Sequence, residues 1–209
     1  MNAFSGMGVA GLGAAYLLGS TPFAWLAGRV MRGIDLRQHG SGNLGATNVF
    51  RTLGAPAAVI VLLLDAAKGA VPTLFFAPIF VPGGSSWWPA AMGVAAILGH
   101  VKPYLGMFRG GGKGVATASG VFAALAPGAY GVALTVFLLT VAVTRFVSLG
   151  SMIGAVALAA AAAVLYGPSS HQALLSVIIA AMVAWTHRAN IGRLRRGEES
   201  RLGGKPVQS

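Results

Sequence analysis

Long apolar runs, separated by short polar or glycine-rich stretches, fill most of the chain. Seven runs stand out, at residues 4–30, 55–81, 87–101, 114–126, 128–144, 149–166 and 171–185. A helix needs about 20 residues to cross the hydrocarbon core of a bilayer, so the longer runs suffice and 114–126 is short. The pattern predicts an all-α, polytopic membrane protein with seven transmembrane helices.

The composition favours a membrane protein over a water-soluble one. Of 209 residues, 56% are hydrophobic and 9% are charged, whereas a soluble domain carries about 25% charged residues. Disordered chains are far more polar than this one. The absence of cysteine excludes disulfides, thiolate metal sites and cysteine nucleophiles. The first run lacks the basic segment of a signal peptide, so we expect it to be retained as a span.

Basic residues collect in alternate connections between the runs. The chain has 15 Lys and Arg against four acidic residues, a net charge of +11. All but Lys68 lie at the end of the first, third, fifth or seventh run or in the connection after it: Arg29, Arg32, Arg37, Arg51, Lys102, Arg109, Lys113, Arg145, Arg188, Arg193, Arg195, Arg196, Arg201 and Lys205. Basic connections stay in the cytoplasm, so this alternation predicts an outside N-terminus and a cytoplasmic C-terminus.

These features together predict one integral membrane domain over residues 1–209, with a basic cytoplasmic tail from about 188. We expect a bacterial cell (inner) membrane location, with the active site on the cytoplasmic face. In a soluble protein such positive charge would indicate nucleic acid. In a membrane protein it indicates topology, an anionic substrate such as a phosphate, or both.

The loop after the first run is polar for so apolar a chain. It reads HGSGNLGATNVFR from His39 to Arg51. Glycines allow left-handed backbone and close approach of a ligand, and Ser, Thr and Asn side chains supply hydrogen bonds. The alternative is a flexible interhelical connection. We predict that the loop binds substrate through a set of five residues: Ser41, Asn43, Thr47, Asn48 and Arg51.

A basic, glycine-rich loop follows the third run and reads GGGKGVAT from Gly110 to Thr117. Backbone N–H groups at a helix start form an anion site, to which Lys113 adds a charge. The loop is not a Walker A motif, because Met107 and Gly114 stand where that motif needs other residues. The alternative is a topogenic loop with a glycine hinge. We predict phosphate binding by four residues, Gly111, Gly112, Lys113 and Gly114, and we predict that Lys113 also takes part in catalysis.

A third polar group lies where the last run ends. On a helix, His187 and Asn190 are three residues apart and share a face. The neighbouring Arg188 and Arg193 would reach toward phosphates or lipid headgroups. An interfacial basic end explains these arginines but leaves His187 and Asn190 unexplained. We therefore predict that His187 and Asn190 take part in catalysis and that Arg188 binds substrate.

Several further polar residues are candidates. Asp65 and Lys68 lie inside the second run at i,i+3 and can pair, either as a structural ion pair or as part of the site. Ser148 either hydrogen-bonds a ligand or caps a helix. His100, near the glycine loop, is a plausible site residue. His171 falls on the opposite face and is discounted.

With four acidic residues, the chain lacks the machinery of several enzyme classes. No pair of carboxylates suits glycoside hydrolysis, and no Asp cluster suits a catalytic magnesium ion. No histidine has an acid five residues on, which excludes the H-x4-D motif of the common glycerolipid acyltransferases. We therefore expect neither a metal nor another cofactor.

The polar blocks together resemble the PlsY family, the bacterial membrane glycerol-3-phosphate acyltransferases that use acyl phosphate as donor. Three blocks carry the resemblance: Gly40 through Arg51, Gly111 through Thr117, and His187 through Leu194 followed by Gly197. Asp65-x-x-Lys68-Gly69 and the segment from Arg145 to Ser151 are also similar. The chain departs from the family pattern at Ala189, where many members have Glu, and in one additional glycine before Lys113.

The resemblance implies a seven-helix fold and transfer of a fatty acyl group from acyl phosphate to the 1-hydroxyl of sn-glycerol 3-phosphate. The products would be lysophosphatidic acid and phosphate, in phospholipid biosynthesis. Ser41, Arg51, Lys113, Ser148, His187 and Asn190 match family positions used for substrate contacts or catalysis. The implied partners are these substrates and membrane lipids, without nucleic acid, and a functional monomer is expected.

The residues leave the proton acceptor open. His187 would act as general base on the attacking hydroxyl, or the phosphate of the donor would accept the proton. Two functions of other classes are alternatives. One is a small phosphate or organophosphate transporter, against which stand the position of the polar residues at one face and the lack of an inverted repeat. The other is a lipid-binding subunit, which would not need a loop rich in Asn and Ser.

Overall fold

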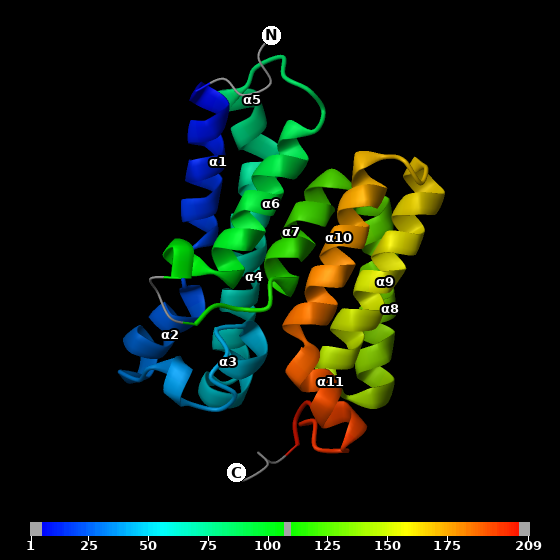
Figure 1. The fold of residues 1–209 in the computed structure, drawn as a ribbon. Coiled ribbons are helices and arrows are strands. Elements are labelled where there is room, and N and C mark those ends of the chain that lie inside the picture. Colours follow the sequence, from blue (N-terminus) through cyan, green and yellow to red (C-terminus); the bar gives the residue numbers. More distant parts are fainter. Residues whose placement is uncertain (1–5, 107–109, 205–209) are drawn as a thin grey trace. The chain divides into compact units, whose positions relative to one another are not determined.

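The computed structural model describes residues 6–106 and 110–204, and its described residues are helices and their connections, without a strand (Figure 1). They form two compact units, Met1–Leu125 and Ala126–Ser209. The predicted all-α class is confirmed for this part of the chain. Three features of the sequence prediction lie outside the described residues: the start of the first run at Phe4, Arg109 in the glycine loop, and Lys205 in the tail.

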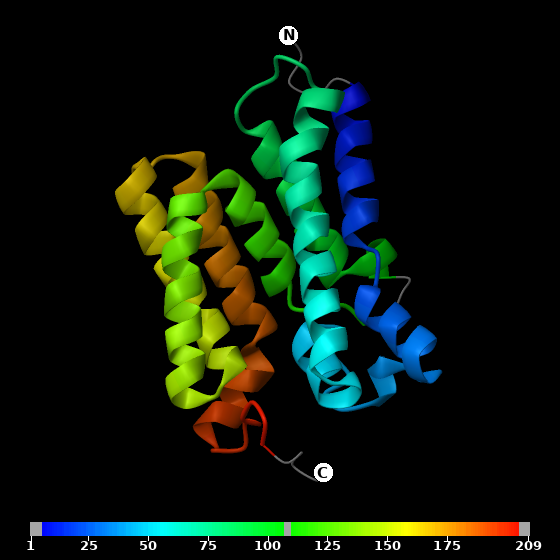
Figure 2. The same cartoon turned by 180° about the vertical axis from the view of Figure 1, so that it is seen from behind.

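The first unit contains seven α-helices among its described residues, joined by shorter helical turns. The helices are α1 (Gly6–Gly19), α2 (Phe23–Arg32), α3 (Ala46–Leu53), α4 (Ala55–Val71), α5 (Ala77–Phe80), α6 (Trp88–Val101) and α7 (Val115–Leu125). The turns are η1 (Leu36–Gln38), η2 (Pro72–Phe76) and η3 (Pro103–Gly106). α4, η2 and α5 follow one another directly, so the second apolar run is one continuous helical segment, Ala55–Phe80 (Figure 2).

Glycines bring the helices of the first unit into backbone contact. A β-carbon on Gly19 of α1 would overlap the backbone of Ala96 in α6, and one on Gly99 would overlap the carbonyl of Tyr16. A β-carbon on Gly120 of α7 would likewise overlap the carbonyl of Ala66 in α4. Small residues let apolar helices approach closely where burial of hydrophobic surface from water is not available as a driving force. The glycines of these runs therefore set the helix spacing beneath the polar loops.

The first predicted run is two helices rather than one. α1 ends at Gly19 and α2 begins at Phe23, with Ser20, Thr21 and Pro22 between them. Proline has no backbone N–H and restricts the residue before it, so a helix cannot pass through this point undisturbed. The carbonyl oxygen of Thr21 accepts a hydrogen bond from the Lys68 ammonium at 2.9 Å. The break thus supplies an acceptor to a charge buried in α4.

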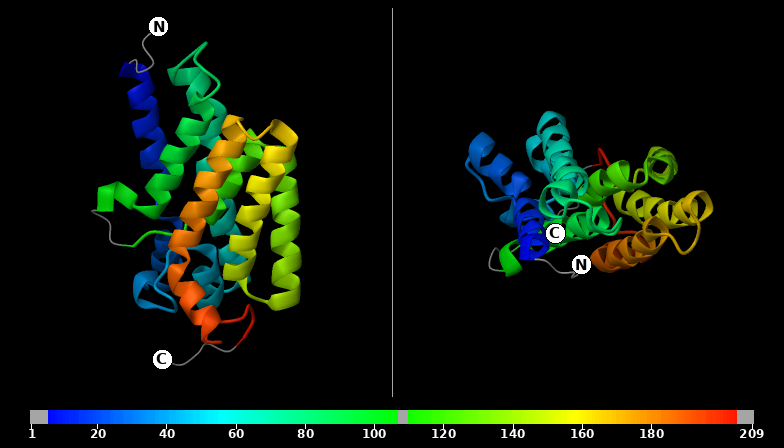
Figure 3. Two further views of the ribbon diagram at one scale, coloured as in Figure 1. Left: turned by 45° about the vertical axis from the view of Figure 1, so that its right-hand side comes forward. Right: turned by 90° about the horizontal axis from the view of Figure 1, so that it is seen from above.

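The second unit contains α8 (Pro127–Thr144), α9 (Val147–Tyr166), α10 (His171–Thr186) and α11 (Arg188–Arg195). α9 packs between α8 and α10, as the view from above shows (Figure 3). The chain bends by 58° between α10 and α11, and His187 is the residue at the bend. After α11 the chain turns back, and the backbone N–H of Leu202 donates to the carbonyl of Arg145 at 2.7 Å.

All seven predicted runs contain helices, but not all of these helices have the length of a membrane span. Four helical segments of the described chain are long and apolar enough to cross a membrane: Gly6–Arg32, Ala55–Phe80, Pro127–Thr144 and Val147–Tyr166. The bent pair His171–Thr186 and Arg188–Arg195 makes up to five. The helices Trp88–Val101 and Val115–Leu125 are apolar but shorter.

The long helices expose large apolar side chains. Val143 on α8 is 84% exposed and Val164 on α9 is 83% exposed, and they are joined by many exposed Leu, Ile and Phe side chains on α4, η2 and α10. A water-soluble protein would bury such residues, whereas hydrocarbon solvates them. The surface of these helices is therefore suited to contact with lipid.

Candidate functional site

The first polar loop is folded around the side chain of Asn48, which is buried at 2% exposure. Its Oδ1 accepts a hydrogen bond from the backbone N–H of Ser41 at 2.9 Å. Its Nδ2 donates to the carbonyl oxygens of Leu36 and His39 at 3.3 and 3.0 Å. Gly40 has a φ of +61°, and a β-carbon there would overlap Asn48 Oδ1. Asn48 therefore determines the shape of the loop from within.

Asp35 fixes the start of the same loop. Its carboxylate accepts hydrogen bonds from Arg37 Nε at 2.9 and 3.1 Å and from Arg29 Nη2 at 3.3 Å. The backbone N–H of Arg37 also donates to Asp35 Oδ1, at 3.0 Å, and so caps η1. The guanidinium of Arg37 holds the pKa of Asp35 well below its usual range, although burial opposes the shift. Arg37 is thereby fixed as a structural cation.

The two predicted substrate loops meet at Gly111. Asn43 Nδ2 donates to the Gly111 carbonyl at 3.3 Å, and the backbone N–H of Leu44 approaches the same oxygen at 3.5 Å. Lys113 lies two residues further on, and Gly114, between Lys113 and the start of α7, has a φ of +82° that favours glycine. The structure thus joins loops that are 68 residues apart in the sequence.

The glycine loop also contacts the end of α6. The backbone N–H of Gly112 donates to the His100 carbonyl at 3.2 Å, and this hydrogen bond holds the loop against the end of α6. The first N–H groups of α7 have no carbonyl partner within the helix and point out of its N-terminus. These groups and the positive end of the helix dipole suit an anion, and Lys113 stands two residues before the helix in the sequence.

The remaining candidates of the first loop lie on α3. Thr47 is in the first turn of this helix and Arg51 is one turn later, so both lie on the same face. Arg51 is exposed and Thr47 is partly exposed. Ser41 is also exposed, in the loop before the helix. This surface of the first unit therefore presents a hydroxyl-bearing loop and a guanidinium.

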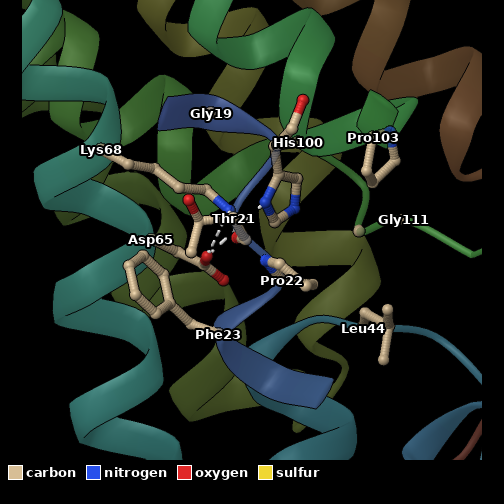
Figure 4. Close-up of a pocket in the computed structure, with 12 residues that line it drawn as sticks. Gly19, Thr21, Pro22, Phe23, Leu44, Asp65, Lys68, His100, Pro103 and Gly111 are labelled. Atoms are coloured by element: carbon tan, nitrogen blue, oxygen red, sulfur yellow. Dashed lines mark hydrogen bonds and ion pairs between the residues drawn. The ribbon is translucent and has the colours of Figure 1, made fainter. Parts of the chain in front are cut away.

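Asp65 and Lys68 form the ion pair that their spacing predicts. Lys68 Nζ lies 2.7 Å from Asp65 Oδ1, and both side chains are 2% exposed. His100 Nδ1 lies 3.6 Å from the same carboxylate oxygen. These three residues line a small pocket together with Leu44, Gly111, Gly112 and the α1–α2 break (Figure 4). The pair is therefore next to the substrate loops, not remote from them.

In the second unit, Glu199 gathers two of the predicted site residues. Ser148 Oγ donates to Glu199 Oε1 at 2.8 Å, and Asn190 Nδ2 donates to the same oxygen at 2.6 Å. Arg193 Nε donates to Glu199 Oε2 at 2.7 Å. Burial alone would raise the pKa of Glu199, but the hydrogen bonds from Asn190, Ser148 and Arg193 outweigh it and lower that pKa. Ser148 therefore bonds a carboxylate and does not cap α9, whose N-cap is Phe146.

The tail that carries Glu199 is also tied to Arg145. The Arg145 guanidinium donates to the Leu202 carbonyl through Nε and Nη2, at 3.1 and 2.8 Å. Arg145 itself has a φ of +62°, an uncommon conformation for a residue other than glycine. Arg201 lies over the ring of Phe146 at 5.4 Å from its centroid. These contacts fold the basic tail onto the α8–α9 connection.

His187 is buried at the bend between α10 and α11, at 3% exposure. Its Nδ1 lies 2.8 Å from the carbonyl oxygen of Val183. A carbonyl only accepts, so Nδ1 carries a proton, and whenever the ring is neutral its lone pair is at Nε2. Arg188, by contrast, is exposed and stacks over Trp185 at 4.8 Å from the ring centroid. The Nδ1-protonated tautomer of His187 has, at Nε2, the lone pair that a general base requires.

The structure therefore gathers the predicted residues into two groups, one in each unit. The first comprises Ser41, Asn43, Thr47, Asn48, Arg51, Gly111, Gly112, Lys113, Gly114 and the pair Asp65–Lys68. The second comprises Ser148, His187, Arg188 and Asn190. Within the described ranges, no three His, Asp or Glu side chains are arranged to hold a metal ion.

Sequence reasoning missed Asp35 and Glu199 as organising residues. A signal for both was present in the composition, since the chain has only four acidic residues. Charged carboxylates are rarely buried unless they are paired. In a chain with so few acids, each one is therefore a candidate partner for a basic residue that must be held in place.

Comparison with known proteins is consistent across sequence and structure. The family model "Glycerol-3-phosphate acyltransferase" matches residues 9–197. A glycerol-3-phosphate acyltransferase of Halalkalibacterium halodurans is 44% identical over 194 residues, covering 91% of this chain and 93% of the relative. One of Anaeromyxobacter dehalogenans is 43% identical over 192 residues, covering 90% and 94%.

Two solved structures are similar over nearly the whole chain. Both are crystal structures of PlsY (YgiH), an integral membrane glycerol 3-phosphate acyltransferase. The glycerol 3-phosphate form has a TM-score of 0.84 and 37% identity, covering 94% of this chain and 96% of the other. The lysophosphatidic acid form has a TM-score of 0.82 and 36% identity, covering 95% and 97%.

Glu199→Gln should destabilise the second unit. The change removes a buried negative charge that accepts three hydrogen bonds, and the loss of a charge-assisted bond costs about 2 kcal/mol, or roughly 5 °C in Tm. The folded-state pKa of Glu199 lies below its ordinary value of 4.5, so its stabilisation is complete above that pH and is lost as the pH falls through the folded pKa. Thermal unfolding in detergent at pH 7 and at lower pH measures both effects.

Glu198→Gln is the matched control, because Glu198 is 52% exposed and pairs only with the exposed Arg196 among the contacts seen. We expect its Tm to equal that of wild type. The difference between wild type and E199Q should narrow as the pH falls below 4.5. Equal effects of both variants, or a difference independent of pH, would contradict the role of the Glu199 carboxylate.

Proposed function

The chain belongs to the glycerol-3-phosphate acyltransferase family, and on this premise we propose that it transfers a fatty acyl group from acyl phosphate to the 1-hydroxyl of sn-glycerol 3-phosphate. The products are lysophosphatidic acid and inorganic phosphate, in phospholipid biosynthesis. The family model covers residues 9–197, which include both compact units. This coverage supports a single acyltransferase domain.

The observation that carries the proposal is the junction of the two loops at Gly111. The Asn43 side chain binds the Gly111 carbonyl, which brings the loop of Ser41 to the glycine loop that ends in Lys113. Hydroxyl and amide groups suit the glycerol moiety, and Lys113 with the N-terminus of α7 suits a phosphate. Arg51 would bind the second phosphate, since guanidinium groups match phosphate geometry.

Acyl phosphate is already activated, so the reaction requires no covalent enzyme nucleophile. The hydroxyl oxygen of glycerol 3-phosphate attacks the carbonyl carbon, and the bond from that carbon to the phosphate oxygen breaks. The leaving phosphate departs with the electron pair, and its growing charge is stabilised by Lys113 and the α7 N-terminus. Holding two anions in reactive geometry is the main task of such a site.

The second unit supplies the candidates for proton transfer. His187, with its lone pair at Nε2, would accept the proton of the attacking hydroxyl. Asn190 would orient substrate, while Ser148 and Glu199 fix its amide and Arg188 contacts a phosphate. Asn48, which is fully engaged within its loop, would serve the substrate indirectly by holding the backbone of Ser41.

We further propose seven crossings, with the N-terminus outside, the C-terminus and the active site in the cytoplasm, and a location in the bacterial inner membrane. The alternation of the basic residues supports this topology. The 14 residues of α6 and the 11 of α7 would then complete their crossings with flanking backbone or by lying within the protein. Glycerol 3-phosphate is highly charged, so a cytoplasmic site would meet it without a transport step.

Because the chain has no cysteine, single cysteines report topology without background. Ser86→Cys and Ser169→Cys, both exposed, should react with a membrane-impermeant maleimide added to intact cells. The equally exposed Gln38→Cys and Arg195→Cys should react only after permeabilisation. Labelling of all four in intact cells, or the reverse pattern, would refute the proposed orientation.

The purified protein should form lysophosphatidic acid from acyl phosphate and labelled glycerol 3-phosphate, without CoA or acyl carrier protein. Lys113→Ala should lower kcat/KM by about 100-fold or more, since it removes a charged donor to a phosphate that gains charge during the reaction. Membrane expression should be unchanged, because Lys113 is partly exposed in a loop.

Lys102→Ala is the control for that experiment, as Lys102 is exposed and close in sequence to the same loop. It should retain wild-type turnover. Near-normal turnover of K113A would remove Lys113 from the site. Binding of glycerol 3-phosphate without any product would argue for transport instead of catalysis.

His187→Gln tests the proton acceptor. We expect kcat to fall about 100-fold and the acidic limb of the pH–rate profile to disappear, because Gln has no titratable nitrogen. A steady-state pH series with both substrates saturating measures this. A retained pH profile with a modest loss of rate would instead assign the proton to the phosphate of the donor.

A further inference from the structure

His100 connects the buried ion pair of α4 to the glycine loop. It lies at the end of α6 and is 5% exposed. Its Nδ1 is 3.6 Å from Asp65 Oδ1, and its opposite edge lies against Gly112, where a β-carbon would overlap Nε2. Figure 4 shows the His100 ring between the side chains of α4 and the loop backbone at Gly111.

The backbone of α6 holds the loop at the same place. The Gly112 N–H donates to the His100 carbonyl at 3.2 Å, and a β-carbon on Gly111 would overlap the carbonyl of Val101. The loop is therefore seated on His100 through both the ring and the main chain. Lys113, the predicted phosphate ligand, directly follows Gly112 in the sequence.

The Nδ1 side of His100 faces the Asp65–Lys68 ion pair, which is itself held in place by several contacts. Lys68 pairs with Asp65 at 2.7 Å, donates to the Thr21 carbonyl at 2.9 Å and lies 5.5 Å from the centre of the Phe23 ring. Separating buried opposite charges leaves each one unpaired in a poorly solvating environment. Asp65 is therefore a rigid support for the imidazole.

We propose that His100 is a positioning residue: braced by Asp65 and Lys68, its ring sets the backbone of Gly111, Gly112 and Lys113 for phosphate binding. The proposal rests on the acyltransferase function above and deepens it. His100 acts through the loop rather than on the reacting atoms, because its Nε2 edge faces Gly112. Preorganised loops bind with less ordering cost, so a displaced loop loses affinity for its substrate.

This role predicts a specific kinetic signature. Loss of the ring should raise the KM of the substrate whose phosphate the loop holds, because a loop that must be ordered on binding loses affinity for ground state and transition state alike. Little change in kcat is expected, because Lys113 is still present to stabilise the leaving phosphate once the substrate is bound. A merely structural histidine would instead lower the amount of folded protein and leave the KM of the folded fraction unchanged. The two roles are therefore separable by measurement.

His100→Asn is the main variant, because the Asn amide reaches the Asp65 side but leaves the Gly112 side unsupported. We expect the KM for acyl phosphate, whose leaving phosphate the loop is proposed to hold, to rise about tenfold, with kcat within about twofold of wild type. His100→Gln, whose amide extends to the position of Nε2, should restore the KM toward wild type. His171→Asn, the same change near the start of α10, is the control and should alter neither constant.

A double variant tests the contact itself. Gly112→Ala places a β-carbon into the ring and should raise the same KM by more than His100→Asn does. Adding His100→Asn to Gly112→Ala shortens the opposing side chain, so the double variant should have a lower KM than Gly112→Ala alone. Unchanged KM values in H100N, a loss confined to kcat, or no recovery in the double variant would overturn the proposal.

Folding and function are checked separately. Thermal unfolding in detergent reports whether the variants fold, and failure of both H100N and H100Q to fold would make His100 purely structural and overturn the proposal. If wild type forms no lysophosphatidic acid, the proposed reaction fails. The positioning role is then read from the inorganic phosphate concentration that raises Tm half-maximally, which should be about tenfold higher for H100N.

Discussion

A pair of opposite charges buried in an apolar helix is the constraint on which the first unit depends. Moving a single ion from water into a poorly polar interior costs several kcal/mol, so Lys68 and Asp65 require each other and further polar contacts. The α1–α2 break supplies one of these contacts, because Thr21 lies between the two helices and its carbonyl accepts from Lys68. His100 supplies another on the side of the glycine loop. The break in α1, the end of α6 and the loop are thus arranged around one charge pair.

The scarcity of acidic residues has the same physical basis. Of the four in the chain, Asp35, Asp65 and Glu199 are buried, and each accepts from or pairs with a basic side chain. Asp35 holds the start of the first loop, and Glu199 holds the side chains of Ser148 and Asn190. Asp65 lies 3.6 Å from His100, whose carbonyl accepts from the glycine loop. Because the 15 basic residues far outnumber the four acidic ones, the chain has a net charge of +11, which favours phosphate-bearing substrates.

The proposed chemistry requires little of the protein beyond this arrangement. Acyl phosphate brings its own leaving group, so the site needs to bind two anions, stabilise the departing phosphate and direct one proton. The glycine loop with Lys113 and the start of α7 suits the anions, and His187 in its Nδ1-protonated form suits the proton. The carboxylates serve as supports rather than as catalysts, which agrees with the absence of paired acids in the sequence.

The sequence by itself determined which segments are helical, where glycine-rich loops interrupt them, and the pairing of Asp65 with Lys68. These features depend on residues within a few positions of one another, such as the i,i+3 spacing on one helix or an uninterrupted apolar run. The tertiary structure decided which distant groups meet. Asn43 reaches Gly111 across 68 residues, and Ser148 reaches Glu199 across 51.

The same division explains the differences between expectation and structure. Asn48 is a residue type that suits a substrate ligand, yet both its amide oxygen and its amide nitrogen form hydrogen bonds with backbone groups of its own loop. Glu199 lies in the C-terminal tail of the sequence, where an exposed side chain would be expected, yet it is buried because the chain turns back after α11. A local pattern records which conformations are allowed nearby. The path of the chain through three dimensions decides which polar groups must satisfy one another when they are buried.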